Sequence, residues 1–173
     1  MTAPLFLADR AAIRSDVIVL SGPEGRHAAT VRRIRPGERV DVADGDGLLA
    51  ECVVTATGAA TVELAVRARR EVPAPEPAIA VVQAIPKGDR AELAVETMTE
   101  VGVDVIVPWA AERCVARWPG ERAGRQLGRW RARAREAAKQ ARRARVPEVS
   151  GPASSADVAA RIARAAGAAR SAR

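Results

Sequence analysis

Polar side chains that can bind an anionic ligand gather on one flank of a strongly basic segment. Between Arg117 and Arg145 the chain has ten arginines and one lysine against two glutamates, a local net charge of +9 that exceeds the +7 of the whole chain. Apolar residues recur there at helical spacing, which predicts a long helix. Five polar residues then share one narrow arc: Arg129, Arg133, Glu136, Gln140 and Arg143. Cations mixed with a carboxylate and an amide can orient a polar anion, so this flank is the candidate site; a solvated charged face is the alternative.

The remaining faces of this helix are predicted to have structural roles. The stripe expected to be buried consists of Ala123, Leu127, Trp130, Ala134, Ala137 and Ala141. A second basic flank holds Arg131, Arg135, Lys139 and Arg142. We expect this second flank to be a solvated surface.

A strand, a helix and a strand must position the basic helix. Ile79–Ile85 and Val103–Val107 are nearly continuous apolar runs, as expected of strands covered on both faces. Between them Asp89 is the expected N-cap and Gly102 the expected C′ residue of a helix. The predicted apolar face of that helix consists of Ala91, Ala94, Val95, Met98 and Val101. The pattern predicts a right-handed βαβ unit with parallel strands, to which Val146–Val149 adds a third.

Residues 1–71 are predicted to form a separate small β-domain. Pro4–Ala8 and Val17–Leu20 have strand character, and a basic helical turn follows. Asp44–Gly47 contains two Asp-Gly steps between alternating apolar runs, which is a strong hairpin signal. Such strands would form a compact antiparallel sheet that curls into a small barrel. Prolines at 73, 75 and 77 stiffen the segment that follows, so the expected domains are residues 1–71 and 72–173.

Composition favours a polyanionic partner. Lys and Arg number 28 against 21 Asp and Glu, and aromatic residues are 2% with no Tyr. Recognition of a nucleic acid would therefore depend on phosphate charge and shape rather than on base stacking. Trp109, Trp118 and Trp130 are expected to be core or interface anchors. Cys52 and Cys114 are expected to be small buried hydrophobes in a reducing compartment. The amino terminus has neither a signal peptide nor a membrane span, so we expect a cytoplasmic protein without a membrane partner.

Three segments together resemble the RsmE family of bacterial ribosomal RNA methyltransferases. They read HAATVRRIRPGERVDVADGDG, QAIPKGDRAELAVETMTEVGVDVIVPWAAERC and EAAKQARRARVPEV. The resemblance implies an α/β protein with a small β-domain: an N-terminal PUA-like β-barrel, then a SPOUT-class α/β-knot methyltransferase domain with a parallel sheet. It also implies S-adenosylmethionine as methyl donor, N3 of one uridine in 16S rRNA as acceptor, and a homodimer.

The chain departs from the family pattern at two places. The family's glycine-rich donor loop and knot segment have no match between Ser150 and Arg173, so we expect a truncated methyltransferase domain without an identifiable cofactor site. Gly22-Pro23-Glu24-Gly25 resembles part of that loop but lies in the β-domain, and we treat the likeness as coincidence. Lys139 stands where the family usually has an acid. The alternatives are a non-catalytic RNA-binding fragment and a generic basic nucleic-acid binder.

Individual roles follow from the resemblance. Arg113 and Arg143 are candidates for orienting the base or a phosphate, with Glu136 as a polar partner; an Arg-Glu pair on a helix flank explains them equally well. His27 alone would be a packed or capping residue, but the resemblance places it on the RNA-facing surface. The RNA-binding candidates are His27, Arg32, Arg33, Lys87, Arg129, Arg133 and Gln140. Lys87 is otherwise an exposed turn lysine, and no metal ligands are expected.

Overall fold

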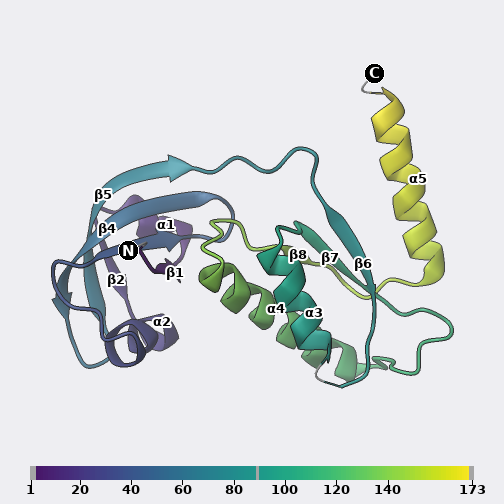
Figure 1. Cartoon of the computed structure of the whole chain (residues 1–173), viewed down its shortest axis with the longest axis horizontal. Helices are drawn as coiled ribbons and strands as arrows, with labels where there is room; N and C mark the ends of the chain where they lie inside the picture. Colours follow the sequence, from purple (N-terminus) through teal and green to yellow (C-terminus); the bar gives the residue numbers. More distant parts are fainter. Residues whose placement is uncertain (1–2, 89, 172–173) are drawn as a thin grey trace. The chain divides into compact units, whose positions relative to one another are not determined.

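The chain divides into two units, and the computed structural model describes residues 3–88 and 90–171 of them (Figure 1). The first unit consists of residues 1–76 and 138–146, and the second of residues 77–137 and 147–173. Asp89, the predicted N-cap, lies outside the described residues. Within the part of the chain that the structure describes, no helix is both long and apolar enough to cross a membrane.

A curled five-stranded sheet forms the first unit. Its strands are β1 (Leu5–Leu7), β2 (Val17–Leu20), β3 (Arg39–Ala43), β4 (Leu48–Thr57) and β5 (Val62–Glu71), in the order β1-β3-β4-β5-β2. β1 runs parallel to β3, whereas the other pairs are antiparallel. Register shifts between Glu51 and Cys52 and between Val54 and Ala56 bend the two long strands. The predicted strands of this domain are confirmed.

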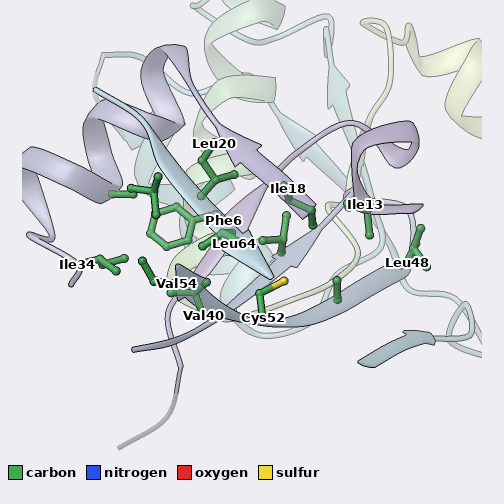
Figure 2. Close-up of a cluster of buried hydrophobic side chains, with 14 residues drawn as sticks. Phe6, Ile13, Ile18, Leu20, Ile34, Val40, Leu48, Cys52, Val54 and Leu64 are labelled. Carbon is green, nitrogen blue, oxygen red and sulfur yellow. The ribbon is translucent and has the colours of Figure 1, made fainter. Parts of the chain in front are cut away.

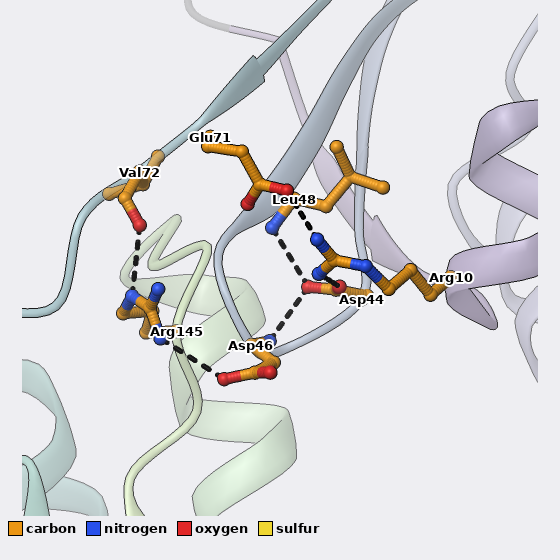
Figure 3. A network of polar contacts seen from close by, with 7 residues as sticks. All are labelled: Arg10, Asp44, Asp46, Leu48, Glu71, Val72 and Arg145. Atoms are coloured by element: carbon orange, nitrogen blue, oxygen red, sulfur yellow. Dashed lines mark hydrogen bonds and ion pairs between the residues drawn. The ribbon is translucent and has the colours of Figure 1, made fainter.

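The predicted Asp-Gly hairpin between β3 and β4 is held by one buried carboxylate (Figure 3). Asp44 Oδ1 accepts hydrogen bonds from the backbone N–H groups of Asp46 at 2.7 Å and Leu48 at 3.0 Å. Its Oδ2 accepts from Arg10 Nη1 at 2.6 Å. Gly47 has φ of +111°, which explains the glycine at this step.

The core of the first unit lies inside the curled sheet (Figure 2). Phe6, Ile18 and Leu64 are at most 1% exposed, and helix α1 (Arg10–Arg14) adds Ile13. Cys52 is buried among them, as expected. The same expectation is wrong for Cys114, which is half-buried because it lies in the loop after the second unit's middle strand.

The second unit contains the predicted parallel βαβ arrangement. Its strands are β6 (Ala80–Ala84), β7 (Val105–Trp109) and β8 (Glu148–Val149), in the order β6-β7-β8 and all parallel. Helix α3 (Arg90–Glu100) connects the first two. The expectation that both apolar runs are fully covered is wrong for β6, which is half-buried because it is an edge strand of this sheet.

Helix α3 ends in a Schellman motif at the predicted glycine. Gly102 has φ of +97°, its N–H donates to Thr99 O, and the N–H of Val103 donates to Met98 O at 3.0 Å. Val95 and Met98 are buried as predicted. Val101 is 72% exposed, contrary to prediction, because the helix has already ended there; Thr99 is buried instead.

Helix α4 (Glu121–Gln140) is the predicted basic helix, and α5 (Ser155–Ser171) follows β8. Trp130, Ala134 and Ala137 of the predicted stripe are buried. Ala141 is exposed, contrary to prediction, because α4 ends before it. Helix α5 begins with a capping box, in which the N–H of Ser154 donates to Asp157 Oδ2 at 2.9 Å and the N–H of Asp157 donates to Ser154 Oγ at 3.2 Å.

Candidate functional site

The carboxyl end of α4 belongs to the first unit, and an arginine in an unusual conformation terminates it. The N–H of Arg142 donates to Lys139 O at 3.1 Å and that of Arg143 to Ala138 O at 2.8 Å. These two bonds form a Schellman motif in which Arg142, with φ of +56°, takes the left-handed position that glycine normally occupies. A non-glycine residue there is strained by about 1–2 kcal/mol.

Arg145 attaches the segment after α4 to the β-domain (Figure 3). Its Nε donates to Val72 O at 2.9 Å, and its Nη1 contacts Asp46 Oδ1 at 3.1 Å. The N–H of Val146 donates to Gly45 O at 2.8 Å. A Cβ on Gly47 would lie 2.5 Å from Arg145 Nη2. Glycine at this turn is therefore needed for the close approach as well as for its backbone angle.

Helix α2 (Gly22–Arg26) continues into a π-helical turn, η1 (His27–Val31), on the other side of the site. Gly25 is buried, and a Cβ there would lie 2.4 Å from Ala60 O, so the Gly-Pro-Glu-Gly string has a packing role in the β-domain. The imidazole of His27 lies edge-on to the Phe6 ring, with centroids 6.1 Å apart. Single π-helical turns are frequent at functional sites.

A buried ion pair joins α2 to the end of α4. Lys139 Nζ donates to Glu24 Oε1 at 2.8 Å, and the Lys139 side chain is 5% exposed. The prediction that Lys139 belongs to a solvated flank is wrong, because the last turn of α4 packs against the β-domain on that face. Ala138 is also fully buried. The two adjacent small residues Ala137 and Ala138 were a signal in the sequence that the buried face of α4 is wider here than the predicted stripe.

These elements enclose a hollow of about 150 Å³ in the first unit, which we call the His27 hollow. It is lined by Pro4, Leu5, Phe6, His27, Arg32, Lys139, Gln140 and Arg142. Arg32 and Arg142 are exposed, whereas His27 is half-buried. Pockets that enclose a whole small molecule measure about 300–1,000 Å³, so the His27 hollow suits a single group such as a phosphate. The structure brings three predicted RNA-binding residues together here: His27, Arg32 and Gln140.

A second, larger hollow of about 530 Å³ lies within the second unit, and we call it the Trp118 hollow. The β6–α3 loop, the segment 115–119 and one side of α4 line it. Its polar and aromatic lining consists of Lys87, Glu92, Arg117, Trp118, Arg122, Gln126, Arg129 and Trp130. Lys87 and Arg129, both predicted RNA-binding residues, meet here. The single predicted flank of α4 is therefore divided between two sites.

The other predicted site residues lie outside both hollows. Arg133 forms an ion pair and a hydrogen bond with Glu96. Arg33 is exposed with φ of +52°. Arg113 is exposed in the loop after β7, Glu136 is exposed on α4, and Arg143 is half-buried after α4.

Arg142 and Lys139 are site residues that sequence reasoning missed. Helical spacing placed both on the solvated flank, since it continued the helix through Arg142. No local pattern indicates that an arginine takes the left-handed position.

Comparison with known proteins identifies both parts of the chain. A family model described as RNA methyltransferase domain matches residues 73–170, and one described as RNA methyltransferase PUA domain matches residues 20–66. The chain is 50% identical over 151 residues to Ribosomal RNA small subunit methyltransferase E of Mycobacterium bovis, covering 87% of this chain and 58% of that protein. Identity to the Bacillus subtilis protein of the same name is 29% over 134 residues, covering 75% and 51%.

Solved structures agree with this result. The crystal structure of a Ribosomal RNA small subunit methyltransferase E from Neisseria gonorrhoeae, bound to S-adenosyl methionine, superposes with a TM-score of 0.74 at 29% identity. That match covers 87% of this chain and 62% of the other. The chain thus spans little more than half the length of the curated relatives it matches.

Proposed function

Because the chain belongs to the RsmE family of RNA methyltransferases, we propose that its protein transfers a methyl group from S-adenosylmethionine to N3 of a uridine in 16S rRNA. The observation that carries this proposal is the 50% identity to the mycobacterial enzyme, which extends over both parts of the chain. Residues 1–71 would bind RNA, and residues 72–173 would belong to the methyltransferase domain. The working form would be a cytoplasmic homodimer that acts on the small ribosomal subunit.

The reaction requires that N3 of uracil lose a proton as the nitrogen attacks the sulfonium methyl group. Positioning of the two reactants supplies much of the rate, and nearby cations stabilise the developing uracil anion. Arg113 and Arg143 are the proposed cations, with Glu136 as a polar partner. S-Adenosylmethionine supplies the electrophilic methyl group, and none of the described residues is assigned to its binding.

RNA binding is assigned to the cationic surface. In the first unit, the exposed guanidinium groups of Arg32 and Arg142 flank His27 and Gln140, so a phosphate oxygen would meet charge and hydrogen-bond donors together. Arg33 extends this surface outside the hollow. In the second unit, Lys87 and Arg129 supply further positive charge.

Arg133 also remains an RNA-binding candidate. Its side chain is 39% exposed, and a guanidinium carries five N–H donors, of which the hydrogen bond from Nη2 to Glu96 uses one. A phosphate could therefore bind next to the existing ion pair without displacing it.

The experiment is a methyl-transfer assay with radiolabelled S-adenosylmethionine and RNA from the 16S decoding region. A methyl group on N3 blocks Watson–Crick pairing, so reverse transcription of the product should stop beside one uridine. Label incorporated elsewhere, or equally into an arbitrary duplex at matched salt, would refute the assignment of the acceptor.

A non-catalytic RNA-binding protein is the second candidate. The observation that favours it is the strongly cationic lining of the Trp118 hollow, which suits phosphate better than a donor that carries a sulfonium and an ammonium group. Titration calorimetry of the 173-residue chain with S-adenosylmethionine separates the two candidates. Heat of binding supports the enzyme, whereas RNA binding without donor binding supports the second candidate for this chain.

A further inference from the structure

We propose that the Trp118 hollow binds one unstacked nucleotide of single-stranded RNA, with its base against Trp118 and its phosphate among Lys87, Arg122 and Arg129. The inference rests on the proposed RNA substrate and adds to it a subsite in the second unit. It also changes the sequence-based expectation that the tryptophans are anchors alone. Trp130 is such an anchor, since it is 1% exposed.

The charge of the hollow selects an anion. Lys87, Arg122 and Arg129 form no ion pair with a carboxylate within residues 3–88 and 90–171. The fourth cation, Arg117, donates from Nη2 to Glu112 O at 2.8 Å, and Glu92 is the acid in the lining. Positive charge therefore exceeds negative charge around an open cavity, which favours phosphate and opposes a net cationic ligand.

The aromatic wall adds affinity for a base. Trp118 is half-buried and stands perpendicular to Trp130, with an interplanar angle of 89° and centroids 5.1 Å apart. The buried neighbour holds the indole of Trp118 in place, so little side-chain freedom remains to be lost on binding. Bases stack on such side chains in proteins that bind single-stranded nucleic acid.

Beside the hollow lies a buried donor that has no acceptor among the described residues. Trp130 lines the hollow, and its indole Nε1 is buried without a hydrogen-bond partner among the described residues. Buried polar groups in native proteins are almost always hydrogen-bonded. Because Nε1 is withdrawn from solvent, a nucleotide oxygen would reach it only after a shift of the Trp130 side chain, so the proposal rests on Trp118 and on the cations.

Size and place in the fold agree with a nucleotide. The volume of about 530 Å³ falls in the range of small-molecule sites. Lys87 follows the carboxyl end of β6, and the segment 115–119 follows that of β7. Ligands of open parallel sheets bind at this edge.

The test compares binding of a uridine pentanucleotide with binding of the same backbone carrying an abasic central residue, using the 173-residue chain. Trp118→Ala should weaken binding of the pentanucleotide about 5- to 150-fold and leave binding of the abasic strand nearly unchanged. Trp118→Phe should retain most of the affinity, since phenylalanine can still stack. Thermal unfolding checks that each variant is folded. If Trp118→Ala does not fold, the binding of Trp118→Phe and of the arginine variants described next still tests the subsite.

Arg122 and Arg125 lie on the same turn of α4 and provide a test variant and a control variant for the proposed phosphate contact. Arg122→Gln should reduce the slope of log affinity against log salt by about 0.7. Arg125→Gln should not, because Arg125 lies outside the hollow and is 3.9 Å from Glu121. Equal slopes for the two variants would overturn the phosphate assignment.

Three further results would overturn the subsite, and each has a different consequence for the proposed function. If the folded Trp118→Ala variant binds the pentanucleotide as tightly as the parent chain, the proposed subsite is wrong. If the protein nevertheless methylates RNA, the proposed function stands without this subsite. If uridine 5′-monophosphate competes as tightly as the pentanucleotide, the Trp118 hollow is a site for a free nucleotide and not for RNA. Failure of the parent chain to bind RNA overturns the subsite and the RNA-binding part of the proposed function together.

Discussion

Lys139 donates a hydrogen bond from Nζ to Glu24 Oε1 across 2.8 Å, and its side chain is almost fully withdrawn from water. The two residues are 115 positions apart in the chain. The pair therefore fixes the last turn of α4 against α2, and it sets the spacing of His27 and Gln140 across the hollow between them.

Removal of either partner should destabilise the first unit. We expect Lys139→Ala to cost about 2–3 kcal/mol, somewhat less than a fully buried pair, because Glu24 is 24% exposed. Urea unfolding followed by circular dichroism measures the change. Arg135→Ala, on the exposed side of the same helix, should change the free energy of unfolding by no more than about 0.5 kcal/mol. Similar losses in the two variants would show that the pair is not the cause.

Arg142→Gly should separate stability from binding. Glycine adopts the left-handed conformation without strain, so we expect a gain of about 1 kcal/mol in the free energy of unfolding together with weaker RNA binding and a smaller salt slope. Arg33→Gly relieves the same kind of strain at φ of +52° outside the hollow. It should stabilise similarly with a smaller loss of affinity. If Arg142→Gly leaves RNA affinity unchanged, Arg142 does not contact RNA.

The turn at Gly47 should be far less tolerant of alanine than the turn at Gly37. Both glycines have positive φ, but a Cβ at Gly37 meets nothing within 4 Å, whereas one at Gly47 lies 2.6 Å from Val72 O. We expect Gly37→Ala to cost about 1–2 kcal/mol and Gly47→Ala at least about 1 kcal/mol more. Thermal unfolding of both variants measures the difference. Equal costs would show that the backbone angle alone requires glycine.

The two thiols should react at very different rates. Burial, and secondarily Asp41, raises the pKa of Cys52 to about 11, so little thiolate forms at pH 8. Cys114 is only half-buried. Ellman's reagent should modify one thiol per chain promptly and the second only on unfolding. Prompt reaction of both thiols in the folded chain would contradict the buried position of Cys52. The Cys114→Ser variant is the control, because its only thiol is that of Cys52.

Asp41 should make the folded state less stable at neutral pH than in acid. Burial first, and Glu51 second, raise its pKa, so the folded chain binds the proton more tightly than the unfolded chain. This contribution is therefore lost as pH rises from the ordinary carboxyl pKa through the raised value. Asp41→Asn should improve stability relative to the parent more at pH 7 than at pH 3. A pH-independent difference in unfolding free energy would contradict this assignment.

Local sequence alone determined most of the elements. Alternating apolar residues specified β3 and β4, the Asp-Gly steps specified their hairpin, and Gly102 marked the end of α3, because each depends on neighbours a few positions away. The basic helix and the three strands β6, β7 and β8 followed from the same kind of pattern, whereas the order of the strands in the sheet did not. The resemblance to the RsmE family covered both parts of the chain.

Tertiary structure alone decided the sites. Lys139 is buried where the last turn of α4 packs against the β-domain, with Glu24 as its ionic partner, and no local spacing encodes a partner 115 residues away. The single predicted flank of α4 became two sites because its last turn packs within the first unit while Arg129 faces the loop around Trp118. Helical periodicity places a side chain on a face, but the partner across that face decides whether its charge is solvated, paired or free to bind a ligand.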